Sequence, residues 1–388
     1  MKAEILKMLK EADDHISGQQ LCEQFQVSRT AVWKVVNQLK EEGYQVEAVR
    51  NKGYRIIESP DVLTREELSV QIGDATRWAG QEIVCFTETD STNVRARKLG
   101  ENGAAHGTLV VAEQQTAGRG RRGRGWESPA VSSIYMSLLL RPEFLPNKAP
   151  MLTIVMAYSV ATALREQTGL DFRIKWPNDI VLNGKKVVGI LTEMSTEIEY
   201  INHVVIGVGI NVNTEAFPEE ICATATSIRL ESGKTWRRAE LIAAILRQFE
   251  VQYERFVKEE DLAYLREAYD AVLVNCNREV RILGEKDGYR AVALGIDDQG
   301  ELPKRRRDCD VCVCGRSICP RYLWICIRKG KRCSMEETVL CVANSYERKF
   351  YLNPEFASLP ESIRQELQIM CVLYTEDVGG IFMVVYNE

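Results

Sequence analysis

The first 58 residues carry apolar positions with the period of a helix, followed by a shorter stretch with the period of a strand. One apolar helical face consists of Ile5, Leu6, Met8 and Leu9. Ser17 and Gln20 fit a capping box, and the helix predicted after them carries Leu21 and Phe25 four positions apart. Ser28 is suited to cap a further helix, because its hydroxyl can accept a backbone N–H of the first turn.

The helix predicted after Ser28 has one apolar and one polar face. Its inward positions are Val32, Val36 and Leu39, and its other positions include Arg29, Thr30, Trp33, Lys34 and Asn37. A hairpin is predicted next, with Tyr44, Val46 and Ala48 on one limb, Tyr54 and Ile56 on the other, and a basic tip at residues 50–53. Residues 1–60 therefore predict a winged helix-turn-helix domain.

Two functions fit such a domain. In the first, the helix that begins at Ser28 enters the DNA major groove and the hairpin tip contacts phosphate or the minor groove. The predicted DNA contacts are Ser28, Arg29, Thr30, Trp33, Lys34, Arg50 and Lys52. The alternative is a small helical domain that binds protein. Cationic and hydrogen-bonding residues on both the helix and the hairpin tip favour DNA.

Strand-like and helix-like runs alternate over residues 65–270, after a linker at Glu58–Pro60. Strands are predicted at 82–86, 109–112, 134–140, 172–176, 180–182, 186–194 and 203–213, and helices include 149–166 and 238–257. This order predicts a mixed α/β domain of catalytic size. Short strands and turns in 275–301 predict a small barrel within residues 271–301.

Composition narrows the class of protein. The 388 residues, 45% of them hydrophobic, are enough for two or three domains. The net charge of -5 argues against bulk coating of nucleic acid, although a local basic element can still bind DNA. Because we find no apolar run of bilayer length and no basic-then-apolar leader, we expect no membrane partner and a cytoplasmic location.

The run from Gln115 to Trp126 is the most informative motif. It contains four glycines, which allow a backbone to approach a ligand closely, and four arginines within six residues. These arginines would repel one another unless an anion lay among them, which predicts a loop that folds over a phosphate or an adenylate. A flexible basic surface loop is the alternative. A Walker loop is excluded, because no Gly-Lys-Ser/Thr ending follows.

Further motifs lie at the ends of predicted strands. Residues 175–179 read Lys-Trp-Pro-Asn-Asp, Lys186 precedes Val-Val-Gly-Ile-Leu, and residues 207–211 read Gly-Val-Gly-Ile-Asn. The first places an amine and a carboxylate at a strand end, where binding sites tend to lie. Each alone also fits an ordinary strand and turn, and residues 90–93 (Asp-Ser-Thr-Asn) alone fit a helix cap.

Together these motifs resemble those of the bifunctional biotin protein ligases that double as biotin operon repressors. The resemblance runs from residue 1 to about 301 in the family's order, and the pairing of Gly-Arg-Gly-Arg-Arg-Gly with Lys-Trp-Pro-Asn-Asp is highly specific. It implies an α+β protein with a class II synthetase-like catalytic domain and a small SH3-like barrel. The implied activity uses biotin, ATP and Mg²⁺ to form biotinyl-5′-AMP. Biotin then passes to a lysine of the biotin carboxyl carrier protein of acetyl-CoA carboxylase.

The resemblance also implies roles for individual residues. The biotin site would comprise Ser91, Thr92, Asn93, Gln115, Gly118, Arg119, Arg121, Lys186, Gly189 and Leu191. The ATP site would comprise Arg119, Arg121, Arg122, Arg124, Trp126, Lys175, Asn178 and Asn211. Lys186, Arg121 and Asp179 would be catalytic, with Asp179 also near Mg²⁺. Ordering of the arginine loop would expose a homodimer surface, and two winged helices would then span the operator half-sites of biotin genes.

The implied chemistry suits these residue types. Joining a carboxylate to the α-phosphate of ATP brings two anions together, so lysine, arginine and Mg²⁺ must offset the repulsion. One well-placed donor is typically worth about 3 kcal/mol in the transition state. The mixed anhydride hydrolyses in water, so a loop must cover it until the acceptor arrives.

The resemblance ends after Glu301. Residues 302–334 hold six of the 12 cysteines of the chain. A zinc site with Cys309, Cys312, Cys314 and Cys319 is one interpretation, although tandem Cys-x-x-Cys units at ribbon spacing are missing. The other is out-of-frame translation, because codons compatible with residues 314–328, read one base later, encode the Gly-Glu-Val-Ser-x-Arg ending that such ligases typically carry. The barrel would then be truncated.

Residues 335–388 predict a separate and unrelated small α/β domain. Strands are predicted near 339–342 and 380–385, and a helix near 360–367. This segment resembles short uncharacterised clostridial proteins and carries no identifiable chemistry.

Two other functions remain open for residues 1–301. One is a sensory transcription factor that binds a small ligand and catalyses nothing. The other is lipoyl ligation without a DNA role, which residues 1–58 disfavour.

Overall fold

The computed structural model describes residues 1–123, 125–197, 200–282 and 289–306, and beyond these only short strands between Cys312 and Tyr386. The chain divides into two compact units, Met1–Asp261 and Leu262–Glu388. The described helices include none with the length and apolar character that crossing a bilayer needs.

The first unit begins with the winged helix-turn-helix. Its elements are α1 (Lys2–Glu11), α2 (Gly18–Phe25), α3 (Arg29–Glu41), β1 (Gln45–Val49) and β2 (Gly53–Glu58). Both bonds of the predicted capping box are present, between Ser17 and Gln20, and the Ser28 hydroxyl accepts the Ala31 N–H. The predicted apolar faces of α1 and α3 are buried together, while Trp33 is 56% exposed. The helix and hairpin predictions are therefore confirmed.

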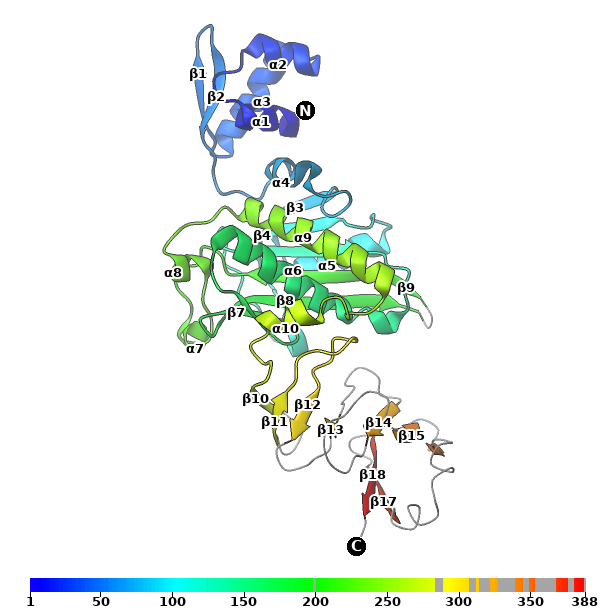
Figure 1. Cartoon of the computed structure of the whole chain (residues 1–388). Helices are drawn as coiled ribbons and strands as arrows, with labels where there is room; N and C mark the ends of the chain where they lie inside the picture. Colours follow the sequence, from blue (N-terminus) through cyan, green and yellow to red (C-terminus); the bar gives the residue numbers. More distant parts are fainter. Residues whose placement is uncertain are drawn as a thin grey trace. The chain divides into compact units, whose positions relative to one another are not determined.

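A seven-stranded sheet forms the centre of the first unit (Figure 1). Its strands are β3 (Ile83–Thr89), β4 (Leu109–Gln115), β5 (Ile134–Leu140), β6 (Arg173–Lys175), β7 (Asp179–Leu182), β8 (Lys185–Thr196) and β9 (Ile201–Ile210). The spatial order is β3-β4-β5-β9-β8-β7-β6, and only the β3–β4 pair is parallel. Every residue of β5 is buried, as expected for a central strand covered on both faces.

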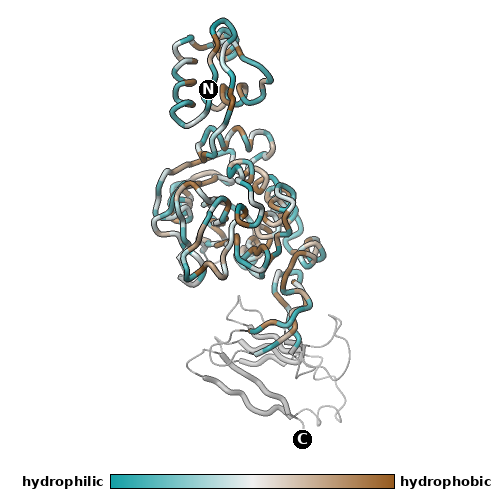
Figure 2. Tube along the Cα trace, turned by 90° about the vertical axis from the view of Figure 1, so that its left-hand side faces the viewer, coloured by the Kyte–Doolittle hydropathy of each residue, from teal (hydrophilic) through white to brown (hydrophobic). Residues whose placement is uncertain are grey.

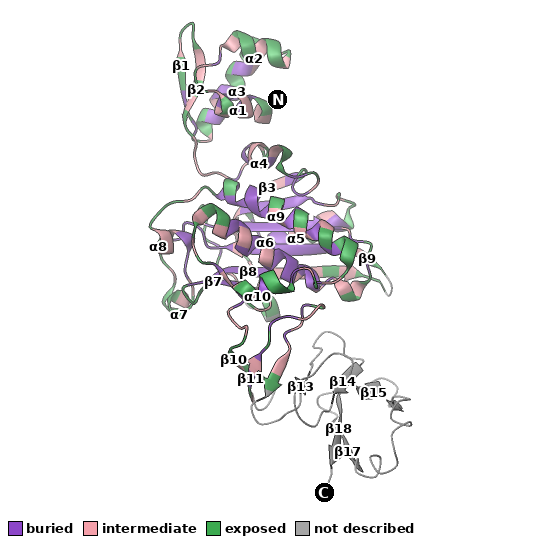
Figure 3. Cartoon of the chain, viewed as in Figure 1, coloured by how far each residue is buried: buried purple, intermediate pink, exposed green. Residues whose placement is uncertain are grey.

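Helices cover this sheet and enclose its core. They are α4 (Arg65–Ile72), α5 (Thr92–Glu101), α6 (Met151–Thr168), α7 (Glu219–Cys222), α8 (Ile228–Ser232) and α9 (Arg238–Glu259). Figure 2 shows hydrophobic and hydrophilic segments alternating along these elements, and Figure 3 shows that the strands of the sheet are buried while the helices carry exposed stretches. Helix α5 packs on β4, β5 and β9 through Ala96, Val110, Leu139 and Val205.

The element boundaries differ from the prediction at a few points. Strand β9 ends at Ile210 rather than at residue 213, because the N–H groups of Asn211 and Asn213 donate instead to Val187 and Ser132. Strand β6 stops before Pro177, which cannot donate to a sheet. Helix α5 begins where only a cap was predicted, and the Ser91 side chain at its N-cap makes no capping bond.

The linker after β2 is held by a buried cation. Arg238 at the start of α9 is fully buried, and its guanidinium contacts Asp61 at 2.8 Å and Glu113 of β4 at 2.6 Å. The Leu63 N–H donates to the same Glu113 carboxylate at 2.8 Å. Residues 61–63 are therefore fastened to the sheet.

The second unit contains a helix and antiparallel strands. They are α10 (Arg266–Val272), β10 (Glu279–Ile282), β11 (Tyr289–Ala293), β12 (Lys304–Arg306) and β13 (Cys312–Val313), with the four strands in that order in one sheet. Because β12 pairs with β11, this sheet continues past residue 301, where the sequence predicted that the barrel stops.

The remaining strands form two small sheets. They are β14 (Tyr322–Cys326), β15 (Val339–Asn344), β16 (Lys349–Leu352), β17 (Gln368–Thr375) and β18 (Gly380–Tyr386). Strands β15 and β18 agree with the strands predicted there, and the predicted helix at 360–367 lies outside the described residues. The side chains of the cysteines considered for zinc also lie outside them.

Candidate active site

A cavity and an adjoining cleft open on the central sheet. The cavity is lined by Ser91, Thr92, Asn93, Gln115, Arg119, Gly120, Arg121, Trp126, Tyr135, Met136, Asn178, Lys186, Gly189, Ile190, Leu191, Gly207, Val208 and Gly209. The cleft is lined by residues that include Gln115, Trp126, Lys186, Asn211, Phe217, Pro218 and Ile221. Gln115, Trp126 and Lys186 line both spaces and therefore stand between them.

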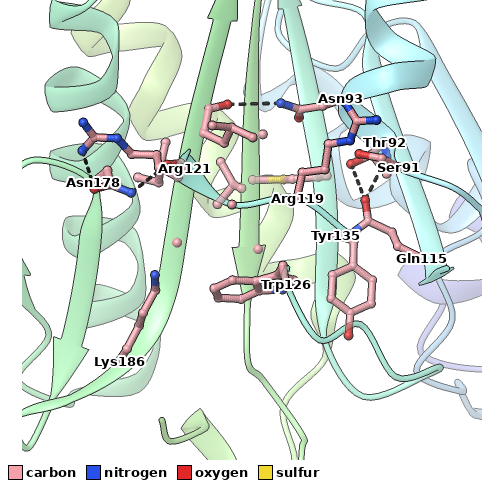
Figure 4. A pocket seen from close by; sticks show the side chains of 18 residues that line it. Ser91, Thr92, Asn93, Gln115, Arg119, Arg121, Trp126, Tyr135, Asn178 and Lys186 are labelled. Carbon is pink, nitrogen blue, oxygen red and sulfur yellow. Dashed lines mark hydrogen bonds between the residues drawn. The ribbon is translucent and has the colours of Figure 1, made fainter. Parts of the chain in front are cut away.

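One side of the cavity is polar, uncharged and buried. The start of α5 brings Thr92 to the end of β4, where the Thr92 N–H donates to Gln115 Oε1 at 2.8 Å (Figure 4). The other end of the Gln115 amide donates to Ser128 Oγ at 3.0 Å. Tyr135 also lines the cavity; burial raises its pKa to about 12, and its hydroxyl donates to the Pro129 carbonyl at 2.9 Å. Such a surface suits a neutral, hydrogen-bonding ring.

The opposite side is cationic. Arg121, an exposed residue of the glycine-rich loop, donates there to Asn178 Oδ1 at 2.9 Å. Arg119 of the same loop is also exposed, and Figure 4 shows its side chain reaching toward Thr92 and Asn93 instead. Asn178 in turn donates to the Ile190 carbonyl at 3.0 Å. The side chains of Arg122 and Arg124 lie outside the described residues.

Lys186 lies at the junction of the two spaces. Its Nζ is 2.7 Å from Asp179 Oδ1 and 5.3 Å from the centre of the Trp126 ring. Asp179 Oδ1 is buried and accepts no bond of hydrogen-bond geometry, so the ion pair alone compensates it. An ammonium in this position can contact an anion from either side.

Two glycines make room for the Trp126 indole. Gly189 of β8 and Gly209 of β9 are direct cross-strand partners. A Cβ would come within 2.7 Å of the indole at Gly189 and within 2.6 Å at Gly209. The ring therefore lies against a floor without side chains.

Most of the residues predicted for the site are brought together, but Gly118 and Lys175 are placed differently. Gly118 packs against the Trp126 carbonyl and is not among the cavity-lining residues. Lys175, at the exposed end of β6, lines neither space. Asn211 lines the cleft, and its side-chain amide donates to the Thr226 carbonyl at 3.1 Å.

Sequence reasoning missed the apolar wall of the cleft. Phe217, Pro218 and Ile221 lie at or before α7, where apolar residues of a loop carry no motif. Tyr135 and Met136 were also missed, because on a buried strand they look like ordinary core.

The outward face of the winged domain is polar. Arg29, Thr30, Trp33 and Lys34 on α3 are exposed, as are Arg50 and Lys52 at the hairpin tip. A groove between helix and wing is lined by residues that include Gln19, Arg29, Arg50, Asn51 and Lys52. Cations on both sides of a groove suit a phosphate backbone.

Three family models match the chain. The Biotin/lipoate A/B protein ligase family matches residues 84–211, and an HTH domain matches residues 2–55. A family of unknown function, DUF6145, matches residues 337–388.

Characterised relatives extend this match over both domains. The bifunctional ligase/repressor BirA of Bacillus subtilis (strain 168) is 41% identical over 307 residues, which are 78% of this chain and 93% of that protein. BirA of Escherichia coli (strain K12) is 32% identical over 300 residues, 77% of this chain and 90% of that protein. The chain belongs to the bifunctional ligase/repressor family. The resemblance seen in the motifs is thus confirmed.

Solved structures agree with this assignment. The biotin protein ligase from Aquifex aeolicus in complex with biotin and ATP is 32% identical and superposes with a TM-score of 0.52. That match covers 59% of this chain and 93% of the other. The ligase fold expected from the motifs is therefore confirmed for this ligase/repressor.

Proposed function

We propose that this ligase/repressor joins biotin to ATP as biotinyl-5′-AMP and transfers biotin to a lysine of the biotin carboxyl carrier protein of acetyl-CoA carboxylase. One observation carries the proposal: Lys186 stands between a cavity with a neutral polar wall and a cleft with an apolar wall, and contacts both. Such a junction suits a reaction that joins two substrates, whereas a sensor of one small ligand needs a single cavity.

In the first step, a biotin carboxylate oxygen attacks the α-phosphorus of ATP and the bond to pyrophosphate breaks. Thr92 and Gln115 would hold the ureido ring, which leaves the carboxylate beside Lys186. Lys186, Arg119 and Arg121 would offset the charge that gathers on the phosphate oxygens. Trp126 and Asn211 would border the nucleotide in the cleft.

Asp179 is the residue suited to hold Mg²⁺. Its Oδ1 atom is buried, with only the Lys186 ammonium beside it, and Mg²⁺ typically takes one or two carboxylates together with phosphate oxygens. Among the described residues no cluster of three or more His, Cys, Asp or Glu side chains could hold a metal ion. When bound, the ion would neutralise phosphate charge.

In the second step, the amine of the acceptor lysine attacks the acyl carbon and AMP leaves. The amine must lose a proton, and the Asp179 carboxylate, which pairs with Lys186 here, would receive it once Lys186 contacts the adenylate. Ligation of a carrier protein would take place in the cytoplasm.

The exposed face of α3 and the wing would bind operator DNA of biotin genes, with Arg29 and Lys34 in the major groove and Arg50 and Lys52 on the backbone. A homodimer with bound adenylate would present two such faces to two half-sites. Lys34→Ala should weaken binding to selected DNA without changing ligation. Equal DNA affinity in the variant would contradict this interface.

The ligase proposal is tested with labelled biotin, MgATP and a biotin carrier domain. We expect label on the carrier lysine, release of pyrophosphate, and loss of both when a chelator removes the metal. Arg121→Ala should lower the yield strongly. Label transfer from lipoate in place of biotin would favour lipoyl ligation, and binding of biotin without pyrophosphate release would favour the sensor.

We also propose that residues 302–334 are encoded out of frame and that 335–388 derive from a separate gene. Support comes from the ligase/repressor relatives, whose match spans 307 residues of the chain, and from the separate family match over 337–388. A chain with the frame repaired should be more stable and adenylate biotin faster. Sequencing the encoding DNA tests this, and codons incompatible with the shifted ending would reject it.

A further inference from the structure

A chain of hydrogen bonds lies behind the neutral wall of the cavity. Ser137 of β5, Gly207 of β9 and Leu191 of β8 are direct neighbours across three adjacent strands. The side chain of Asn93, on the first turn of α5, lies across Gly207, where a Cβ would come within 2.1 Å of Asn93 Oδ1. The glycine therefore lets the Asn93 amide reach from Ser137 to Leu191.

The orientation of the Asn93 amide is fixed by its partners. Its Nδ2 donates to the Leu191 carbonyl at 3.3 Å and to Glu193 Oε2 at 2.7 Å (Figure 4 shows the first of these). A carbonyl and a carboxylate can only accept hydrogen bonds. The amide nitrogen must therefore face β8, and its oxygen must face Ser137.

This orientation fixes the hydroxyl of Ser137, which is fully buried. Ser137 Oγ is 2.6 Å from Asn93 Oδ1, and because an amide oxygen can only accept, the single hydroxyl hydrogen of Ser137 lies between them. Ser137 Oγ is also 2.8 Å from Thr92 Oγ1. Ser137 has no second hydrogen, so the hydrogen in this contact belongs to Thr92, whose hydroxyl is also 3.1 Å from Gln115 Oε1, another acceptor in the wall.

The consequence appears at the cavity surface. The Thr92 hydroxyl hydrogen points back into the wall, so its lone pairs remain for a ligand. Gln115 Oε1 beside it receives the Thr92 N–H and lies within hydrogen-bond distance of the Thr92 hydroxyl. Thr92 and Gln115 both line the cavity, and the Thr92 oxygen is the acceptor left for a ligand.

We propose that Ser137, oriented through Asn93 by Glu193, is a specificity-determining positioning residue that makes this wall accept N–H donors. The inference rests on the proposed function, because a ureido ring supplies two N–H groups. The dithiolane ring of lipoate supplies none and would leave the free lone pairs of the Thr92 oxygen without a donor. Sites built to bond a substrate N–H reject analogues that lack it strongly.

The test begins with Ser137→Ala in the full chain. Without Ser137, only the longer contact to Gln115 Oε1 holds the Thr92 hydroxyl hydrogen in the wall, so the hydrogen can turn toward the cavity more readily, where it opposes a ureido N–H. We expect the KM for biotin to rise roughly tenfold to a hundredfold, with kcat and the KM for ATP within about twofold. The matched control is Ser159→Ala, which removes an equally buried hydroxyl that bonds the Val155 carbonyl within α6.

Glu193 offers a second pair of variants at a partly exposed position. Glu193→Gln retains a carbonyl oxygen that can accept from Asn93, so it should keep the biotin KM near that of the unmodified chain. Glu193→Leu removes the acceptor and should raise the KM for biotin several-fold.

A biotin analogue methylated on the ureido nitrogens gives a further readout. The unmodified chain should prefer biotin over this analogue, and Ser137→Ala should reduce that preference at least tenfold. An unchanged preference, or equal rises in the KM values for biotin and ATP, would overturn the inference. If the unmodified chain releases no pyrophosphate with biotin, the proposed function itself fails, which is a different result.

Discussion

Thr92, Asn93 and Ser137, on the side of the site proposed to bind biotin, are at most 4% exposed, and each is hydrogen-bonded to another strand or helix. On the side proposed to bind the nucleotide, Arg121 is exposed. A neutral ring is recognised by the direction of its donors and acceptors, which requires side chains that cannot rotate. A polyphosphate is recognised by charge, which acts over several ångströms and tolerates movement. The two sides thus follow from the chemistry of the two ligands.

The largest expected effect comes from removing Arg238, whose buried guanidinium pairs with Asp61 of the linker and Glu113 of β4. Arg238→Leu would leave Asp61 and Glu113 facing each other without a cation, and should lower the free energy of unfolding by about 3–5 kcal/mol. Urea denaturation measures this. Arg237→Leu, which loses only the exposed pair with Glu240, should cost less than about 1 kcal/mol. Equal losses of unfolding free energy in the two variants would show that the buried Arg238 ion pairs do not stabilise β4, which carries Gln115.

The second effect tests the junction of the two sides. Lys186→Ala should lower kcat/KM for biotin-dependent pyrophosphate release by about 100-fold, as expected for one donor to the reacting phosphate. Lys185→Ala is the control, because that exposed neighbour donates only weakly, to the Cys222 carbonyl at 3.4 Å. Similar losses in both variants would contradict the role of Lys186.

Salt should separate the two sides directly. Raising KCl from about 50 to about 500 mM shortens the screening length from more than 10 Å to less than 5 Å. The KM for ATP should then rise several-fold, while the KM for biotin, which depends mainly on buried neutral bonds, should change less than about twofold. Steady-state kinetics at several salt concentrations measures both. Equal rises in the KM values for ATP and biotin would contradict the difference between a charge-dependent nucleotide site and a neutral biotin site.

The smallest effect concerns the segment after the arginine loop. Val131 has a φ of 58°, which is costly for a β-branched residue, and its N–H donates to the Glu113 carbonyl at 3.3 Å. Val131→Gly should relieve this strain and raise the free energy of unfolding by about 1 kcal/mol, after the entropy cost of glycine. Val131→Ala, which keeps a Cβ, should give a smaller gain. A loss of stability in the glycine variant would show that the strain is absent.

The sequence predicted the motif-bearing part of the site and most of the strands around it. Arg121, Asn178, Lys186 and Trp126 lie in runs whose composition is unusual enough to indicate chemistry. Ser137 and Glu193 could not be predicted, because a single polar residue on a strand carries no motif and its role depends on two neighbouring strands.

The Arg238–Asp61 ion pair could not be predicted from the sequence for a similar reason. Arg238 and Asp61 are 177 positions apart, and their contact follows from how α9 and the linker meet on the sheet. Nothing in the local pattern around either residue indicates it.

The central claim is that biotin and ATP meet at Lys186, where the biotin carboxylate bonds to the α-phosphorus of ATP and pyrophosphate leaves. It is tested most directly by exchange of labelled pyrophosphate into ATP on the full chain. We predict exchange that requires biotin, is not supported by lipoate, and is nearly lost in Lys186→Ala but retained in Lys185→Ala. Exchange without biotin, or exchange unaffected by Lys186→Ala, would contradict the account.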